Sequence, residues 1–360
     1  MRIGILGGGQ LAMMMVETTQ HLDLEYIVVD PAENPPASKF TNCIRAEFDD
    51  KKMLDMLIKE CDVVTIDFEN VPAESLEYLE TKIQVFPSSQ SLRICQDRKM
   101  EKELFIKNNV KAAEYQNVSS LEDLKNAVKN IGKDSILKSR KFGYDGKNQF
   151  MIQNNDIEKI WIDCKKIPSI LEKKINFKTE LSLIGVRDQK KEIVFYPLVE
   201  NIHKKGILRI SVSDYGNNDL QNQAEKILKK IMESLDYIGV LVIEFFLTSD
   251  DVLIANEMAP RVHNSGHWSI EGANISQFES HINSIIGVKN TQIKIIKKSA
   301  MINLLGTLPK FDKIYKLDNV FIHKYNKKER ANRKLGHITI IDDNDQNLKK
   351  KINSIENIIN

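Results

Sequence analysis

The chain has 360 residues, of which 42% are hydrophobic and 28% are charged, and its formal net charge is +2. This length is enough for two or three domains with separate cores. The nearly balanced charge gives no sign of the basic surface that nucleic acid or an anionic membrane requires, so we expect neither as a partner.

The first six residues read directly as a strand and lack the apolar segment and cleavage site of a signal peptide. No apolar run reaches the length that spans a bilayer. The cysteines carry no pairwise motif, as expected for reduced thiols inside a cell, and they stand at Cys43, Cys61, Cys95 and Cys164. We therefore predict a cytoplasmic protein.

Residues 1–96 alternate between strand and helix patterns, which predicts a doubly wound, parallel α/β sheet of the Rossmann-like type. The expected strands cover residues 2–6, 25–30, 62–66 and 84–86. The expected helices cover residues 10–20, 51–59 and 73–81.

The rest of the chain predicts three α+β units. Residues 97–172 form a small unit, with helices at 97–109 and 121–130 and strands at 135–139 and 147–152. Residues 173–292 form a larger unit, with antiparallel strands and a long helix at 220–235. Residues 293–360 form the last unit, with a final polar helix after short strands at 300–305, 320–324 and 337–341.

A glycine loop, GGGQLA at residues 7–12, joins the first expected strand to the first expected helix. Its backbone N–H groups can hold a phosphate at the helix N-terminus. The loop also fits the loose dinucleotide pattern G-x-G-x-x-A, and Asp30 ends the second strand about twenty residues later. A nicotinamide or flavin protein and a purely structural turn therefore stay open beside phosphate binding.

A second glycine turn, GYDGKNQ at residues 143–149, joins two expected strands. An Asp-Gly tip is typical of a plain hairpin. Two glycines flanked by Lys138, Arg140, Lys141 and Lys147 are equally typical of a mobile flap that closes cations over a polyphosphate. Lys138 lies in an otherwise apolar strand, which favours a directed role over a solvated one.

Two acids occur in a pair of strands that are otherwise largely apolar. Glu244 interrupts the apolar run LVIEFF, where a lone ionised carboxylate is costly to bury, and Glu257 follows the next strand. A hairpin around Asp250 and Asp251 pairs residues whose numbers add up to 501, so Glu244 faces Glu257 with about 5 Å between Cβ atoms. Like charges at that distance repel, so we predict that both acids bind Mg²⁺, with Mn²⁺ as an alternative.

The hairpin leads into the loop NEMAPRVHNSGHW at residues 256–268. The spacing of His263 and His267 invites a zinc site, but Pro260 and Gly266 argue for a loop instead of a helix face, and no third soft ligand is near. A loop with an arginine, a histidine, an asparagine and a serine better suits a polar or anionic substrate.

Three further features have ordinary explanations beside functional ones. Residues 168–175 read as an edge strand whose backbone can recognise a nucleotide base, with Glu180 near the ribose, or as an exposed strand with surface charge. His203 reads as a surface or core histidine. The basic cluster at residues 327–334 lacks the interleaved aromatic residues of a nucleic-acid site, and suits a phosphate clamp or a solvated loop.

Together these motifs resemble the ATP-grasp superfamily, and within it the purine-biosynthetic ligases that carboxylate 5-aminoimidazole ribonucleotide. The resemblance covers essentially the whole chain and is most specific at residues 256–268. It rests on GGGQL at 7–11, DFENVP at 67–72, DRKMEK at 97–102, GYDGKNQ at 143–149, NEMAPRVHNSGHW at 256–268 and RANRKLGH at 330–337. It implies a lid subdomain at 97–172, a large ATP-grasp subdomain at 173–292 and a C-terminal domain at 293–360.

The resemblance also implies the roles of individual residues. ATP would contact Arg98, Lys138, Gly143, Tyr144, Asp145, Gly146, Lys147, Asn148, Gln149, Glu172, Lys173, Lys174, Ile175, Glu180, His203, Asn256 and Glu257. Mg²⁺ would be held by Glu244 and Glu257, and catalysis would involve Lys138, Arg261 and His263. The ribonucleotide would lie against Gly8, Gly9, Gln10, Leu11, Glu69, Tyr144, Arg261, His263, Asn264, Ser265, Lys327, Arg330 and Arg333.

The reaction that the resemblance implies consumes ATP, bicarbonate and 5-aminoimidazole ribonucleotide. It forms 5-(carboxyamino)imidazole ribonucleotide, ADP and phosphate through carboxyphosphate, and the family implies a homodimer. Three alternatives stay open: a different ATP-grasp ligase, an NAD(P)-dependent oxidoreductase built on the first glycine loop, and a non-catalytic ATP sensor.

The chain departs from the family pattern in two places. Ala12 and Met13 stand where the family has Gly-Arg, so an arginine contact near the first loop is absent or is supplied from elsewhere. Ala331 and Asn332 stand where the family has Pro-Gly, which leaves the geometry of that turn open.

Overall fold

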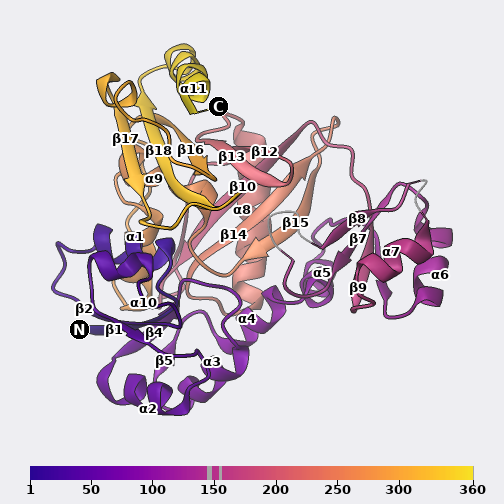
Figure 1. Cartoon of the computed structure of the whole chain (residues 1–360), viewed down its shortest axis with the longest axis horizontal. Coiled ribbons are helices and arrows are strands. Elements are labelled where there is room, and N and C mark those ends of the chain that lie inside the picture. The colour runs from indigo at the N-terminus through magenta and orange to yellow at the C-terminus, as the bar shows by residue number, and fades with distance from the viewer. Residues whose placement is uncertain (144–147, 154–155, 360) are drawn as a thin grey trace.

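The computed structural model describes residues 1–143, 148–153 and 156–359. This part of the chain forms three β-sheets, of five, nine and four strands. The five-stranded sheet lies at the N-terminal end, the nine-stranded sheet in the centre and the four-stranded sheet to one side (Figure 1). The predicted fold class, an α/β domain followed by α+β units, is confirmed. No helix in the described ranges is both long and apolar enough to cross a bilayer.

The N-terminal sheet is parallel and has the strand order β3-β2-β1-β4-β5. Its strands are β1 (Arg2–Leu6), β2 (Glu25–Asp30), β3 (Cys43–Arg45), β4 (Val63–Ile66) and β5 (Gln84–Val85). The helices around it are α1 (Gln10–Thr18), η1 (Pro36–Lys39), α2 (Lys51–Glu60), α3 (Ala73–Glu80) and α4 (Ser89–Cys95). Helices α2 and α3 pack on one face of the sheet and α1 packs on the other, so the predicted doubly wound domain is confirmed. The strand β3 and the helix α4 were not predicted.

The central sheet is antiparallel, with the order β15-β14-β10-β12-β13-β16-β18-β17 and with β11 paired to β10. Its first strands are β10 (Thr179–Arg187), β11 (Ile193–Phe195), β12 (Val199–Lys204), β13 (Ile207–Val212), β14 (Gly239–Leu247) and β15 (Leu253–Ala259). The sheet continues past residue 293 through β16 (Lys298–Leu305), β17 (Val320–Lys324) and β18 (Lys334–Asp342). One sheet therefore joins the large predicted subdomain to the C-terminal segment.

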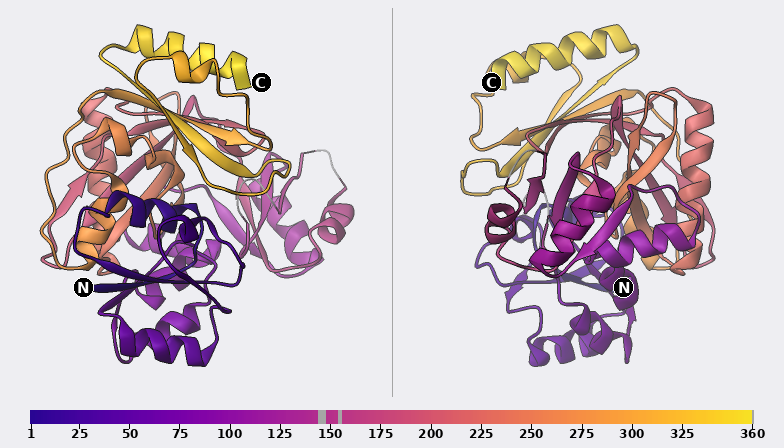
Figure 2. Two further views of the ribbon diagram at one scale, coloured as in Figure 1. Left: turned by 60° about the vertical axis from the view of Figure 1, so that its left-hand side comes forward. Right: turned by 90° about the vertical axis from the view of Figure 1, so that its right-hand side faces the viewer.

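The helices of the central region pack against both faces of this sheet. They are α8 (Asn218–Ser234), η2 (Asn264–Gly266), α9 (Ser269–Gly272), α10 (Gln277–Ile285), η3 (Ile314–Lys316) and α11 (Asp345–Ile359). Helix α8 begins at Asn217, whose side chain accepts hydrogen bonds from the N–H groups of Asp219 and Leu220. Helix α11 and the N-terminal domain lie at opposite ends of the molecule (Figure 2).

The small side sheet has the order β6-β9-β7-β8. It consists of β6 (Tyr115–Val118), β7 (Ser135–Ser139), β8 (Gln149–Met151) and β9 (Ser169–Lys173), covered by α6 (Leu121–Ile131) and α7 (Ile157–Asp163). The prediction of an edge strand at 168–175 is wrong, because β9 lies between β6 and β7. The short and largely polar β6, which pairs along β9, gave no recognisable strand pattern.

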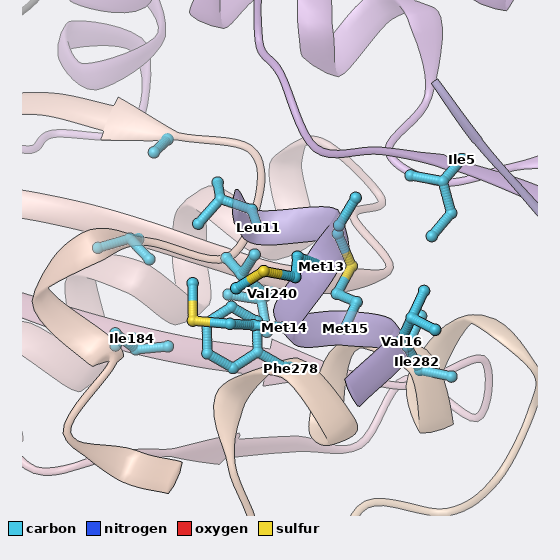
Figure 3. Packing of buried hydrophobic residues seen from close by; sticks show 14 of the residues in the cluster. Ile5, Leu11, Met13, Met14, Met15, Val16, Ile184, Val240, Phe278 and Ile282 are labelled. Atoms are coloured by element: carbon cyan, nitrogen blue, oxygen red, sulfur yellow. The ribbon is translucent and has the colours of Figure 1, made fainter. Parts of the chain in front are cut away.

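Helix α1 is buried between its own sheet and α10. Met13, Met14 and Met15 are each at most 1% exposed, and they pack in one cluster with Phe278 and Ile282 (Figure 3). Residue 13 therefore lies in a core where an unpaired arginine would be costly. Helix α1 itself offers no cation to the glycine loop.

Candidate active site

The site is built around the hairpin of β14 and β15. Glu244 lies opposite Glu257, as predicted. Nearer the turn the predicted pairing is wrong, because Phe246 lies opposite Ile254 and not Ala255. A β-bulge at Asn256 adds one residue to β15, and this bulge restores the predicted pairing at the two acids.

The two facing acids lie in different electrostatic surroundings. Burial and the charge of Glu257 raise the pKa of Glu244 to about 8. Burial opposes the ionisation of Glu257 too, but the nearby charges of Arg98 and Lys138 outweigh it and lower the pKa of Glu257. Glu244 also approaches His263, with 3.5 Å between Oε1 and Nε2. The pair is therefore one carboxylate neutralised by an arginine and one acid without a full countercharge.

The donor chemistry of the hairpin fits a hard divalent cation. Beside Glu244 and Glu257, Asn256 has a buried side-chain oxygen that meets no hydrogen-bond donor of the protein. No cluster of three His, Cys, Asp or Glu side chains suitable for a metal occurs in the described ranges, which disfavours the zinc alternative. Mg²⁺ is commonly held by one or two carboxylates together with substrate phosphates, so two acids suffice for it.

Helix α5 (Arg98–Lys107) lies beside the hairpin and turns charged side chains toward it. Arg98 donates hydrogen bonds to Glu257 Oε2 and to the Gly143 carbonyl oxygen, both at 3.0 Å. Glu101 and Lys102 are 2% and 0% exposed. These three residues share one helix face because they are three and four positions apart. Only Arg98 carries a predicted role, although this spacing was visible in the sequence.

A buried ion-pair network links the small sheet to α5. Lys138 on β7 and Glu172 on β9 lie 2.5 Å apart, and Lys102 approaches the other oxygen of Glu172 at 3.2 Å. Burial alone would raise the pKa of Glu172, but the charges of Lys138 and Lys102 lower it to about 2. Two buried ammonium groups thus share one carboxylate, and this excess of positive charge suits a polyphosphate.

A third part of the site lies on β10 and β12. His203 Nδ1 is hydrogen-bonded to Glu180 Oε2. Burial opposes protonation of His203, but its hydrogen bond to Glu180 and the charge of Glu244 outweigh this and raise the pKa of His203. The rings of Phe177 and Phe246 stack with centroids 4.6 Å apart, and Phe246 is the cross-strand partner of Glu180. This aromatic surface was not predicted.

The predicted flap is described only at its ends. Gly143 is half-buried, and Gln149 pairs with Lys138 across β7 and β8. Lys173 is exposed at the end of β9, and the half-buried Lys174 and Ile175 follow it. Asn148 is exposed, and four predicted residues lie outside the described ranges: Tyr144, Asp145, Gly146 and Lys147.

The first glycine loop is held by two buried or half-buried acids. Gly8 N–H donates to Asp30 Oδ2 at 2.7 Å, and Ala12 N–H donates to Asp67 Oδ2 at 3.2 Å. Gly7 has a φ of +102°, and a Cβ there would lie 2.0 Å from the Asp67 carboxylate, so only glycine fits. The other oxygen of Asp30 accepts from the backbone two residues on. Both oxygens of Asp30 thus accept hydrogen bonds from backbone N–H groups of the protein. This disfavours the dinucleotide alternative, in which Asp30 would bind the ribose.

The loop after the hairpin contributes four predicted substrate residues. Arg261 pairs with Glu69 at 2.6 Å, so two predicted residues from distant motifs meet. The Ser265 hydroxyl is fully buried and hydrogen-bonded to a serine of β10 and to His263 Nδ1. Asn264 is 8% exposed and bonded to Asn303. Ser265 and Asn264 therefore fix the loop, while Arg261 and His263 are more exposed.

The basic cluster from the C-terminal segment reaches the glycine loop. Lys327 donates a hydrogen bond to the side chain of Gln10. Burial and the charge of Arg333 lower the pKa of Lys327 to about 8. Arg333 is half-buried and Arg330 is exposed. Lys327 is thus a cation beside the glycine loop where α1 supplies none.

Family models match the chain in three segments. The ribonucleotide synthetase preATP-grasp domain matches residues 1–96, and the ATP-grasp domain matches residues 103–278. The phosphoribosylaminoimidazole carboxylase C-terminal domain matches residues 299–351. Fold and site together define an ATP-grasp enzyme.

Individual relatives narrow this class. The N5-carboxyaminoimidazole ribonucleotide synthase of Pseudomonas aeruginosa is 39% identical to this chain, and the match covers 100% of this chain and 99% of that protein. The crystal structure of N5-carboxyaminoimidazole ribonucleotide synthetase from Thermus thermophilus has a TM-score of 0.94 at 37% identity, covering 99% of this chain and 98% of its own. The chain belongs to the N5-carboxyaminoimidazole ribonucleotide synthase family.

One further solved structure bears on the ligands of the family. It is the N5-carboxyaminoimidazole synthase of Aspergillus clavatus in complex with ADP and 5-aminoimidazole ribonucleotide. Its TM-score is 0.89 at 28% identity, and the match covers 99% of this chain and 98% of that one.

Proposed function

We propose that this enzyme carboxylates 5-aminoimidazole ribonucleotide to 5-(carboxyamino)imidazole ribonucleotide, with consumption of ATP and bicarbonate and release of ADP and phosphate, in purine biosynthesis. The facing pair Glu244 and Glu257 carries the proposal. Buried cations lie next to this pair, and a loop with further polar residues follows it directly in the chain. A nucleotide sensor would need no such second-substrate loop.

The nucleotide is proposed to bind between the small sheet and the hairpin. Arg98 and Lys138 would meet the phosphates, since both are buried cations whose present partners are carboxylates. Glu180 and His203 would bind the ribose, and the stack of Phe177 and Phe246 offers the base an aromatic surface.

The two glutamates are proposed to hold Mg²⁺, or Mn²⁺ in its place. When bound, this ion would neutralise charge on the terminal phosphates and orient them for in-line transfer. The protein's own cations, Arg98 and Lys138, would supply the remaining neutralisation from fixed positions that cost no reorganisation during the reaction.

The chemistry would proceed in two steps. An oxygen of bicarbonate attacks the γ-phosphorus, the bond to the bridging oxygen breaks, and ADP leaves with the formation of carboxyphosphate. The exocyclic amine of the ribonucleotide then forms a C–N bond with the carboxyl carbon, loses a proton and displaces phosphate. The flap would exclude water, which would otherwise hydrolyse the mixed anhydride.

His263 is proposed as a hydrogen-bond donor in the part of the site that would bind bicarbonate. Burial lowers its pKa well below the usual range, so the ring is neutral near pH 7. The Ser265 N–H donates to Nδ1 at 3.3 Å, which places the ring proton on Nε2. That nitrogen lies 3.5 Å from Glu244 Oε1, and bicarbonate is proposed to bind near it and near Arg261.

The ribonucleotide phosphate is proposed to bind at the glycine loop. The N-terminus of α1 favours an anion there, and Lys327 supplies a full charge next to Gln10. Arg330 and Arg333 would close over the same phosphate from the C-terminal segment.

A direct assay tests this function. ADP formation by the purified protein should require both bicarbonate and 5-aminoimidazole ribonucleotide, and formate or amino acids should not replace bicarbonate. ADP release supported equally by formate would instead assign a different ATP-grasp ligase. A cytoplasmic location stays a prediction from the sequence, and a homodimer stays one from the family resemblance, which sedimentation analysis of the purified protein tests.

A further inference from the structure

The bulge at Asn256 determines which face of the sheet Glu257 occupies. From the turn to Phe245 and Ala255 the paired numbers add up to 500, and beyond the bulge they add up to 501. Continued without the bulge, the first pairing would set Asn256 opposite Glu244 and Glu257 opposite Ile243. A shift by one residue moves a side chain to the other face of a sheet.

The other face is the hydrophobic core. Ile243 is fully buried in the cluster that also contains Leu253, Ala255 and Met258. Ala255 and Met258 are three positions apart where an unbroken strand would place core residues two apart. The acid would thus be driven into this apolar cluster unless the bulge were kept.

Two buried side chains of α5 hold the bulge from outside the sheet. The Lys102 ammonium donates to the carbonyl oxygen of Asn256 at 2.9 Å, and the Met258 N–H donates to Glu101 Oε1 at 2.6 Å. Both backbone groups lie on the outer side of β15, which is an edge strand of the central sheet. These two side chains supply partners that a neighbouring strand would otherwise provide.

We propose that Glu101 and Lys102 are positioning residues that fix the bulge at Asn256 and thereby aim Glu257 at the metal position opposite Glu244. The inference deepens the proposed function, because it rests on the carboxylate pair as a metal site. Lys102 also contacts Glu172, so this lysine joins the hairpin to the strand β9 of the small sheet. One helix turn thus sets the geometry of both sides of the nucleotide site.

The test compares variants that remove or keep the hydrogen bonds. Glu101→Met removes the acceptor for Met258, whereas Glu101→Gln keeps an acceptor of nearly the same shape. Lys102→Met removes the donor to Asn256. Lys99→Met is the matched control, because Lys99 is on the same helix but pairs with Glu103 and not with the hairpin.

Two readouts need neither bicarbonate nor the ribonucleotide. The first is amide hydrogen exchange, in the free protein, of the peptide that contains Met258. The second is the dissociation constant of Mn²⁺ in the presence of ADP, measured by electron paramagnetic resonance. Loss of the hydrogen bond that Glu101 or Lys102 makes with the bulge should weaken Mn²⁺ binding about 10- to 100-fold, as is typical of residues that orient metal ligands.

The expected pattern is faster exchange and weaker Mn²⁺ binding in Glu101→Met and Lys102→Met. Glu101→Gln should stay within about threefold of the wild type, because it keeps the hydrogen bond. If Glu101→Met does not fold, as judged by circular dichroism, Lys102→Met decides. Unchanged exchange and Mn²⁺ affinity in the folded variants would overturn the proposal, whereas a wild-type protein that binds Mn²⁺ and ADP but makes no product would contradict only the proposed function.

Discussion

The nucleotide side and the ribonucleotide side of the site are built differently. On the nucleotide side Lys102, Lys138 and Glu172 are each at most 6% exposed, and each already has an ionic partner. On the ribonucleotide side the proposed contacts come from the first glycine loop, the loop after the hairpin and the C-terminal segment, and Arg330 is exposed. A buried, paired network is arranged before the substrate arrives, whereas an exposed side chain such as that of Arg330 loses freedom when the substrate binds. Changes on the nucleotide side should therefore lower kcat, and changes at Arg330 and Arg333 on the ribonucleotide side should mainly raise KM.

The largest effect should follow from Glu257→Gln, which removes one of the two carboxylates that are proposed to hold the metal. ADP release should fall by about 10³-fold or more while the protein stays folded, since charge neutralisation at the phosphates is lost. Steady-state ADP formation measures this, and circular dichroism checks the fold. Near-normal turnover would remove the metal assignment.

Lys138→Met should have the next largest effect. Loss of this buried cation should lower kcat, or weaken ATP binding, by about 10²- to 10³-fold, comparable to the loss of one preorganised donor. Lys133→Met is the matched control, because Lys133 lies just before the same strand and is more exposed than Lys138. An equal rate in the two variants would show that Lys138 is an ordinary ion-pair residue without a role in ATP binding or phosphoryl transfer.

Arg330→Ala and Arg333→Ala change the ribonucleotide side of the site. Each should raise KM for the ribonucleotide about tenfold, the value of one charge-assisted contact, and change KM for ATP by less than about twofold. Lys328→Ala, at an exposed neighbour, serves as the control. Equal effects on both substrates would argue against the C-terminal segment as a substrate clamp.

The smallest effect concerns how the N-terminal domain docks. His281 Nδ1 accepts from the Val240 N–H, and its Nε2 is hydrogen-bonded to Thr65 Oγ1 of β4. Burial lowers the pKa of His281 to about 4. Because the unfolded chain takes up this proton first, the stability that His281 contributes is complete above about pH 6.5 and is lost as the pH falls toward 4.

The matched experiment compares urea unfolding of the wild type and of His281→Gln at pH 7 and at pH 5. The wild type should lose about 1–2 kcal/mol more than the variant between these pH values, as a shift of one pKa unit corresponds to about 1.4 kcal/mol. An identical loss in both proteins would show that His281 does not govern this acid sensitivity.

Much of the fold followed from local patterns. The alternation of strands and helices in residues 1–96 and the apolar run around Glu244 were enough to predict the parallel sheet and the acid hairpin. The position of Glu257 opposite Glu244 was predicted from an unbroken register, however, and it holds only because the bulge offsets the error nearer the turn. Two polar residues in succession, Asn256 and Glu257, were the signal of the bulge in the sequence.

Contacts between distant segments could not be predicted in the same way. Helical spacing shows that Arg98, Glu101 and Lys102 share a face, but nothing local says that this face meets Asn256 and Met258 more than 150 residues later. Similarly, β9 was predicted as an edge strand because its partner β6 is short and polar. The roles of all the site residues stay predictions, since they depend on ligands.

The nucleotide side is proposed to phosphorylate bicarbonate, and the resulting carboxyl group is proposed to be transferred to the ribonucleotide. Turnover with ¹⁸O-labelled bicarbonate, followed by mass spectrometry of the phosphate released, tests this directly. Each phosphate formed should contain one oxygen from bicarbonate. Phosphate without the label would mean that water, and not bicarbonate, attacks ATP, and the proposed mechanism would be wrong.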